Sequence, residues 1–380
     1  MKSIHVDFSI LVIVLGVPLQ IMSLLFFYLQ YEIPTHYLSR FLTDDISVFA
    51  PYYFLFNMFV IVVFYFISKR TGIFSFTIDT RTNNLFVMYF VILVAIILLI
   101  VTGGKTGARS LIVQTAPELL IMSWLITLFP AIAYLKNNLR ISINVLLFML
   151  SSMFVNIQLG GFGGAIKPVL VIIFIEISYR FSIRLVFRYM TIVFFLLMTE
   201  PLIFGHFDEF ALNIFTKSYF DRYLNSLLFI SAAWLGEINL QLESYFSVLP
   251  FSRYFMEFES TRDIFNMHFA GGRYENGYSF PVLYTAELLV LFGSIALFAP
   301  IIFLFVYFFV VQKLSYIKYY DFGLVLFLYS VSNLPFMMSS YVATFYKSLF
   351  LAIAVAGVFC TSLFIKSVIT LILPKKRRTH

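Results

Sequence analysis

The chain has 380 residues, of which 61% are apolar, 20% aromatic and only 12% charged. This balance is far more apolar than that of a soluble domain and excludes an ordinary water-soluble fold. The formal net charge of +7 would suggest nucleic-acid binding in a soluble protein, but most cations here lie in short links between apolar stretches, so polynucleotide binding is not expected. With one cysteine, Cys360, this sequence offers neither a disulfide framework nor a thiolate metal site.

Stretches of about 20 apolar residues predict an all-α integral membrane protein with about ten transmembrane helices. In chain order the predicted spans are 8–30, 47–68, 85–102, 110–134, 141–158, 165–179, 186–204, 282–311, 321–340 and 349–372. The first is too long for the core of a signal peptide and further spans follow it, so we expect it to be retained. An even number of spans puts both termini on one side.

The distribution of cations predicts which side that is, because cytoplasmic links carry an excess of lysine and arginine. One set of links contains Lys69, Arg70, Arg81, Lys136, Arg140, Arg180, Arg184, Arg188, Lys313, Lys318 and the terminal PKKRR. We therefore expect both termini in the cytoplasm. The opposite links hold only Arg40, Lys105, Arg109, Lys167 and Lys347. Each of these few outer cations needs a specific explanation.

Two of the outer links share a glycine-rich pattern that ends in a cation, GGKTGAR and GGFGGAIKP. Such glycines let the backbone turn sharply and expose N–H groups at a helix N-terminus, where the dipole and the cation both favour an anion. Our hypothesis is that both corners bind one pyrophosphate. Alternatively, the cations reach lipid headgroups and the glycines only form turns. The corresponding residues are Gly103, Gly104, Gly107 and Arg109 in the first corner, and Gly160, Gly161, Gly164 and Lys167 in the second.

Residues 205–281 form one long polar connection, which divides the chain into 1–204 with seven spans, the 205–281 loop, and 282–380 with three spans and a basic cytoplasmic tail. The loop is expected outside the cytoplasm, and its length indicates a function. Its apolar residues recur at helical spacing, which predicts amphipathic helices on the membrane surface: Phe220, Tyr223, Leu227, Ile230, Trp234 and Ile238. The segment RDIFNMHFAGGRYENGYSF, just before the eighth span, is the best active-site candidate.

The whole chain resembles the O-antigen polymerase (Wzy-type) family of polytopic oligosaccharide repeat unit polymerases. The resemblance is carried by TGARS at the start of the fourth helix, by the single large outer loop, and by GGRYENGYSFPVLYTAELLVLFGSIALF. It implies a glycosyltransferase that polymerises O-antigen repeat units, carried on undecaprenyl pyrophosphate, at the periplasmic face of the bacterial inner membrane. It implies no metal or other cofactor. The implied partners are the lipid-linked oligosaccharide and the phospholipid membrane, and could include a chain-length regulator.

This chemistry assigns roles to candidate residues. A hydroxyl of one unit attacks the anomeric carbon of another and the lipid pyrophosphate leaves, so the site needs cations and a general base. Glu275 and His268 are alternative bases, both in the segment beside Arg273. The candidates for pyrophosphate binding are Arg109, Lys167, Arg273, Lys105, Gly107 and Gly164, and the candidates for the substrate-binding loop are Arg253, Arg262 and Tyr274.

Three alternatives stay open at this point. A lipid-linked glycan flippase would resemble a transporter with short loops, so the long loop favours an enzyme. Another lipid-phosphate-sugar glycosyltransferase would carry paired acids in its first outer loop, where Asp44 and Asp45 lie. An O-antigen ligase shares the large outer loop and the basic residues.

The acids within predicted spans, Glu118, Glu176 and Glu287, could serve in proton relay or substrate binding, or could be hydrogen-bonded between packed helices.

Overall fold

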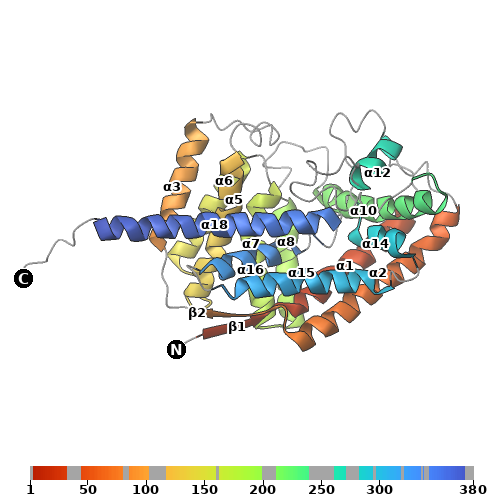
Figure 1. Ribbon diagram of the computed structural model, residues 1–380. Coiled ribbons are helices and arrows are strands. Elements are labelled where there is room, and N and C mark those ends of the chain that lie inside the picture. The colour runs from red at the N-terminus through yellow and green to blue at the C-terminus, as the bar shows by residue number, and fades with distance from the viewer. Residues whose placement is uncertain are drawn as a thin grey trace, which may run out of the picture.

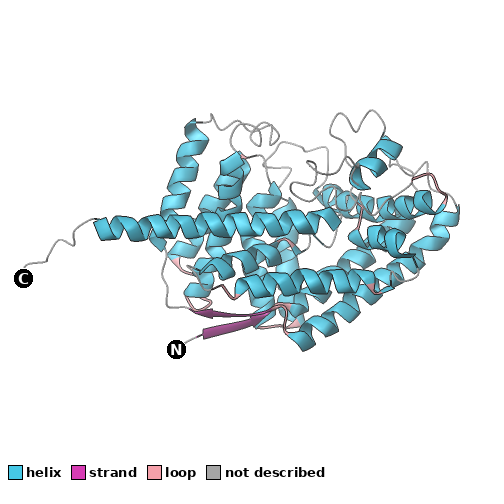
Figure 2. Cartoon of the chain, viewed as in Figure 1, coloured by secondary structure: helices cyan, strands magenta, loops and turns pink. Residues whose placement is uncertain are grey.

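A computed structural model describes residues 3–31, 44–79, 85–101, 117–159, 162–198, 211–238, 261–270, 282–293, 297–317, 321–334, 337 and 342–372. Almost all of them are helical (Figure 2), as an all-α fold requires. The helices are α1 (Ser9–Tyr31), α2 (Asp44–Thr71), α3 (Leu85–Val101), α5 (Pro117–Lys136), α6 (Ile143–Gln158), α7 (Phe162–Tyr179), α8 (Ile183–Met198), α10 (Ala211–Trp234), α12 (Thr261–Ala270), α14 (Tyr284–Phe292), α15 (Ala299–Ser315), α16 (Phe322–Ser332) and α18 (Val342–Ile372). The strands are β1 (Ser3–Asp7) and β2 (Ser75–Asp79).

Three of the described helices are long and apolar enough to cross a membrane, and several shorter ones are also apolar. The long segments are Val48–Thr71 in α2, Leu119–Lys136 in α5 and Lys347–Val368 in α18. These features agree with a membrane protein. The arrangement of ten spans stays a prediction.

The helix α6 is apolar on its exposed side as well as on its buried side. Ser152 and Asn156 are buried among apolar residues, whereas Leu146, Leu150 and Phe154 are exposed. In a soluble bundle the apolar stripe faces the core and polar residues face water. The exposed side of α3 is likewise a row of apolar residues at helical spacing, Phe86, Phe90, Leu93, Ile97 and Ile100. Contiguous apolar faces of this kind fit contact with lipid.

The eighth predicted span, 282–311, is two helices, so the prediction of one long helix was wrong. The first, α14, ends at Gly293, whose φ of +54° is a conformation that glycine adopts without a Cβ clash. The second, α15, begins at Ala299 and has Pro300 in its first turn, where the missing N–H breaks no hydrogen bond. Both breaking residues stand within an uninterrupted apolar run. Hydropathy alone therefore could not separate the two helices.

A small antiparallel sheet that the sequence did not predict joins two distant segments. Ser3 of β1 pairs with Asp79 of β2 at the far end of the register. The turn between α2 and β2 uses Gly72, whose φ is +66°. The ring of Phe76 stacks on that of Phe327 in α16, with centroids 4.9 Å apart. The sheet thereby covers one end of the helix bundle, which we call the sheet end.

Several helix termini meet at the sheet end. The Nζ of Lys136, the last residue of α5, lies 3.0 Å from Oδ1 of Asp321, directly before α16. The side-chain amide of Gln312, near the end of α15, donates a hydrogen bond of 2.7 Å to the carbonyl oxygen of Gly72. In addition, α7 contacts β1. The ends of α2, α5 and α15 and the starts of α1 and α16 therefore lie together.

The helix α16 lies in the middle of the bundle, and each of its residues from Gly323 to Ser332 is buried. It contacts α5, α7, α15 and α18. At Gly323 the backbones of α16 and the end of α15 approach so closely that a Cβ would overlap the carbonyl group of Ser315. A helix that is apolar all round and buried all round is the expected centre of such a fold.

A second, smaller apolar cluster lies away from the sheet end and positions the candidate site. It joins α10, α12 and α14 to the last turns of α1 and the first turns of α2, and we call it the α10 cluster. Figure 1 shows these helices gathered beside α2, on the opposite side of the molecule from α3. Its buried members are Phe27, Ala50, Tyr53, Tyr223, Leu224, Leu227, Leu228, Phe229, Ile230, Ala232, Ile238, Phe265, Val282, Leu283 and Ala286.

Candidate functional site

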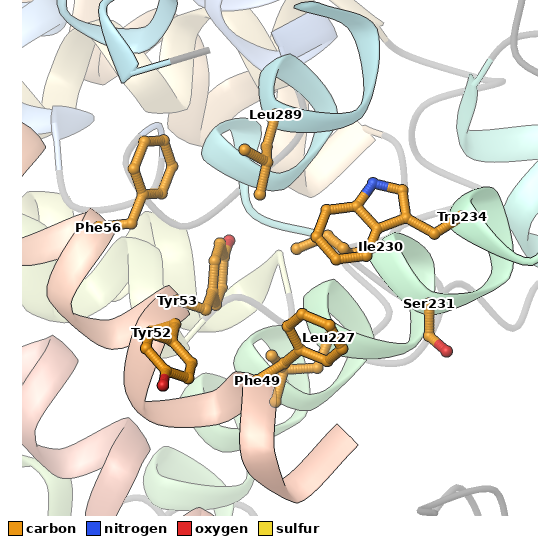
Figure 3. Close-up of a pocket in the computed structure, with 9 residues that line it drawn as sticks. All are labelled: Phe49, Tyr52, Tyr53, Phe56, Leu227, Ile230, Ser231, Trp234 and Leu289. Carbon is orange, nitrogen blue, oxygen red and sulfur yellow. The ribbon is translucent and has the colours of Figure 1, made fainter. Parts of the chain in front are cut away.

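A pocket of about 340 Å³ opens between α2, α10 and α14 (Figure 3). It is lined by Phe49, Tyr52, Tyr53 and Phe56 of α2, by Leu227, Ile230, Ser231 and Trp234 of α10, and by Leu289 of α14. Its rim is aromatic: the rings of Phe49 and Trp234 meet edge to face at 5.1 Å, and Tyr52 is 67% exposed. A pocket of this size with so apolar a lining suits a hydrocarbon chain or ring.

The inner wall of the pocket leads to a buried polar seam. The hydroxyl of Tyr53 lies 2.9 Å from Oγ1 of Thr285, and the side-chain amide of Asn57 donates a 2.9 Å hydrogen bond to the carbonyl oxygen of Tyr53. Beyond Thr285 a small cavity of about 20 Å³ lies between α1, α2 and α14, large enough for about one water molecule. The buried Oε1 of Gln20 lines this cavity and accepts no hydrogen bond from any residue that the structure describes.

Two hydrogen bonds attach α10 to the neighbouring helices. The phenol of Tyr223 donates to the carbonyl oxygen of Ala50 in α2, over 2.5 Å. Burial raises the pKa of this phenol, so the hydroxyl keeps the proton that it donates. Farther along α10, the hydroxyl of Ser226 accepts a 2.9 Å hydrogen bond from the backbone N–H of Leu283, directly before α14. These two contacts fix the walls of the pocket relative to one another.

A histidine and a carboxylate face each other near the same end of α10. The helix α12 packs on α10 through Phe265, whose ring meets that of Phe229 edge to face at 5.4 Å. In the last turn of α12, Nε2 of His268 lies 3.3 Å from Oε2 of Glu237. Glu237 follows Trp234, a pocket residue, by less than one helical turn. Both side chains are partly exposed, so the pair adds little stability but can exchange protons with a bound substrate.

Lys167, a predicted pyrophosphate ligand, contacts the end of α16. Its ammonium donates a 2.5 Å hydrogen bond to Oδ1 of Asn333 and lies 5.3 Å from the centre of the Tyr329 ring. Asn333 is the C-cap residue of α16, and the C-terminus of a helix carries a partial negative charge. The cation is thus bound by an amide, an aromatic ring and a helix dipole. It joins α7 to α16 whether or not it also meets a ligand.

Gly164, the predicted glycine of the same corner, lies within a helix. The helix α7 begins at Phe162, earlier than predicted, so Gly164 falls in its first turn. A Cβ at this position would overlap the side chain of Asn156 in α6. The amide of Asn156 in turn donates a 3.3 Å hydrogen bond to Oγ1 of Thr127 in α5. Close packing of α6 on α7 is therefore sufficient to explain the glycine.

Two of the acids within predicted spans have partners on other helices. The hydroxyl of Tyr134 in α5 donates to the carboxylate of Glu176 in α7. The backbone N–H of Val342, the first residue of α18, donates to the carboxylate of Glu287 in α14. Both acids thus lie between packed helices. The side chain of Glu118 lies outside the described residues.

Most predicted site residues fall outside the part of the chain that the structure describes. These are Lys105, Gly107, Arg109, Arg253, Arg273, Tyr274 and Glu275; Arg262 lies in α12, but its side chain is also outside the description. His268 of α12 and Lys167 of α7 are described and lie in different surroundings: His268 faces Glu237, just after α10, and Lys167 contacts Asn333 at the end of α16. Sequence reasoning missed Glu237 as the partner of His268, and it missed Tyr53 and Thr285. Nothing in their local sequence marks these residues.

No protein-family model matches the chain, and comparisons with curated proteins and with solved structures find no match. Among the described residues no three His, Cys, Asp or Glu side chains come close enough together to hold a metal ion. Function must therefore be inferred from the residues and their contacts.

Proposed function

We propose that the protein is a membrane glycosyltransferase that polymerises undecaprenyl-pyrophosphate-linked O-antigen repeat units at the periplasmic face of the bacterial inner membrane. The proposal joins the resemblance of the sequence to one structural observation. An apolar, aromatic-rimmed pocket lies at the same end of α10 as the pair formed by His268 and Glu237. A substrate with a hydrocarbon carrier and a polar sugar needs both kinds of surface within one site.

The positions of the charged residues support the expected orientation of the chain in the membrane. Lys69, Lys136 and Lys313, which are predicted to be cytoplasmic, lie in the last turns of α2, α5 and α15. These helix ends lie together at the sheet end. The α10 cluster joins the opposite ends of α1 and α2. With the sheet end in the cytoplasm, α10, α12 and the pocket face the periplasm.

In the proposed reaction the acceptor hydroxyl attacks the anomeric carbon of the donor sugar. A new C–O bond forms, the bond from that carbon to the pyrophosphate oxygen breaks, and the electron pair leaves with the lipid pyrophosphate. His268 takes the hydroxyl proton, and Glu237, 3.3 Å from Nε2, holds the ring in one orientation. Glu275 is the alternative base. Arg109, Lys167 and Arg273 neutralise the charge that develops on the pyrophosphate.

The function is tested by the lipopolysaccharide of a strain that lacks the gene. Loss of the ladder with one repeat unit retained is the expected result. Loss of all repeat units would instead identify a ligase or a flippase. An altered single band would identify an enzyme that adds one sugar.

The role of His268 is tested separately by polymerisation of lipid-linked repeat units in vitro. His268→Ala should lower the rate by about 10² to 10⁴-fold, the usual contribution of a general base. His5→Ala is the matched control, because His5 is an exposed histidine on β1, at the sheet end, where its Nδ1 lies 3.2 Å from Oγ1 of Thr77. A wild-type rate for His268→Ala would transfer the role of base to Glu275.

A further inference from the structure

None of the described side chains of the helix α8 is fully buried. Only one side of it is covered, where Val186, Tyr189 and Val193 pack against the main apolar cluster. Its other sides carry exposed apolar residues, including Ile183 and Phe187. The helix therefore presents most of its surface to the surroundings of the protein.

Three arginines lie on this exposed surface. Arg184 and Arg188 are four residues apart, which puts them on one stripe of α8, and Arg180 lies in the short link between α7 and α8. Like charges at this spacing repel each other, and cations in the first turns of a helix oppose its dipole. Within the described part of the chain, none of the three forms a salt bridge, and Glu176 of α7 is the carboxylate near them. The exposed guanidinium groups are therefore accessible to an anion from outside the chain.

The residues beside the three arginines indicate the level in the membrane at which they bind an anion. Tyr179 and Phe181 are exposed beside Arg180, and the guanidinium of Arg180 lies 5.4 Å from the centre of the Tyr179 ring. Aromatic residues of this kind concentrate where hydrocarbon meets headgroups. Farther along α8, Phe187 and Phe195 are exposed and apolar. The arginines thus stand at the boundary between a lipid-facing surface and the sheet end.

The location of this boundary follows from contacts on α7. Tyr134 donates to Glu176 close to the ends of α5 and α7, and α5 ends at the sheet end through Lys136. Since α8 starts directly after α7, its first turns lie at the sheet end as well.

We propose that Arg180, Arg184 and Arg188 bind the headgroups of anionic phospholipids in the leaflet at the sheet end. A guanidinium donates two parallel hydrogen bonds to one phosphate, so a stripe of arginines four residues apart can hold adjacent headgroups. Basic residues beside a membrane-embedded helix are attracted to anionic lipid for the same reason. The site is independent of the glycosyltransferase chemistry; only its assignment to the cytoplasmic leaflet rests on the proposed topology.

The test uses the purified full chain in detergent, with bound lipid counted by native mass spectrometry. The wild type should retain phosphatidylglycerol in preference to phosphatidylcholine. The double variant Arg184→Gln, Arg188→Gln should bind phosphatidylglycerol about tenfold to thirtyfold more weakly, since each basic residue near the surface contributes roughly fivefold. The matched control is Lys69→Gln, Arg70→Gln, which removes two exposed cations from the end of α2 and should leave the preference unchanged.

Four outcomes would overturn the proposal. Retained preference in the α8 double variant would show that these arginines bind no lipid. Equal loss in both double variants would indicate a general attraction to the basic end of the protein. If inorganic phosphate displaces bound phosphatidylglycerol as effectively as added phosphatidylglycerol does, the arginines form a site for a free anion. If the glutamine variant aggregates, the double variant Arg184→Lys, Arg188→Lys is measured instead. It should still retain phosphatidylglycerol in preference to phosphatidylcholine, and loss of that preference would contradict the proposal.

Discussion

The carboxylate of Glu287 on α14 accepts a hydrogen bond from the backbone N–H of Val342, the first residue of α18. The first N–H groups of a helix have no partner within it, and the positive end of the helix dipole attracts an anion. Glu287 thus acts as a cap that one helix supplies to another. This contact gives a buried acid within an apolar bundle a structural role.

Glu287→Ala should therefore destabilise the protein by about 1 to 3 kcal/mol, because a buried N–H loses its acceptor. Glu287→Gln keeps an acceptor oxygen and should lose less. Thermal unfolding of the purified protein in detergent measures both. Glu237→Gln is the control, since this carboxylate is 48% exposed and its removal should change stability little. Equal stability of Glu287→Ala and the wild type would mean that α18 needs no such cap.

The close approach of α15 and α16 predicts opposite effects at two helical glycines. Gly323→Ala should destabilise the protein by about 1 to 3 kcal/mol, because the new methyl group overlaps the carbonyl group of Ser315. Gly357→Ala in α18 should stabilise it by roughly 0.5 to 1 kcal/mol, because no heavy atom lies within 4 Å of the added Cβ and alanine favours the helix. Unfolding in detergent compares the two variants. The same sign for both would contradict the packing described at α16.

The contact between Lys167 and Asn333 predicts an energetic coupling between α7 and α16. The variants Lys167→Met and Asn333→Leu, alone and combined, should show an interaction energy of about 0.5 to 3 kcal/mol in a double-mutant cycle of stability. Lys136→Met with Asn333→Leu is the control, because Lys136 of α5 contacts Asp321 at the start of α16, whereas Asn333 lies at its other end, so the two losses should be additive within about 0.5 kcal/mol. Additive losses for the first pair would show that Lys167 is not held by Asn333 in solution.

The proposed topology predicts which introduced cysteines react from outside the cell. In a Cys360→Ala background, Leu235→Cys should react with a membrane-impermeant maleimide in spheroplasts, because Leu235 follows α10 and is 72% exposed. Ile141→Cys, between α5 and α6, is 67% exposed but should react only after lysis. Labelling detected by mass spectrometry decides the matter. The reverse pattern would put the sheet end in the periplasm.

The lengths of the apolar runs predict most of the helices, because about 20 apolar residues give a helix whatever their order. The sheet could not be predicted in this way, since Ser3 and Asp79 pair across a long separation and each strand has only five residues. The break at Gly293 was equally hidden, because glycine and alanine do not interrupt an apolar run. Local composition reports helix formation but not which distant segments meet.

The same limit applies to the candidate site. His268 was identified because a histidine among cations and glycines before a span is unusual, but Glu237 pairs with it across 31 residues that carry no common motif. Phe49 and Tyr52 line the pocket, yet they are the same kinds of residue as those on the exposed surface of α2. Only the position of α10 on α2 distinguishes pocket from surface.

The complete burial of α16 constrains how the chain reaches its native state. The 11 residues of α16 are about 16 Å long, roughly half the hydrocarbon thickness of a bilayer, so they cover only part of the predicted span 321–340. Its surface is complementary to α5, α7, α15 and α18, three of which precede it in the chain. We therefore expect α16 to enter after those three have associated and before α18 closes over them. Maturation of the protein should then depend on its last helix, and chains released before α18 is synthesised should leave α16 exposed to the membrane quality-control proteases.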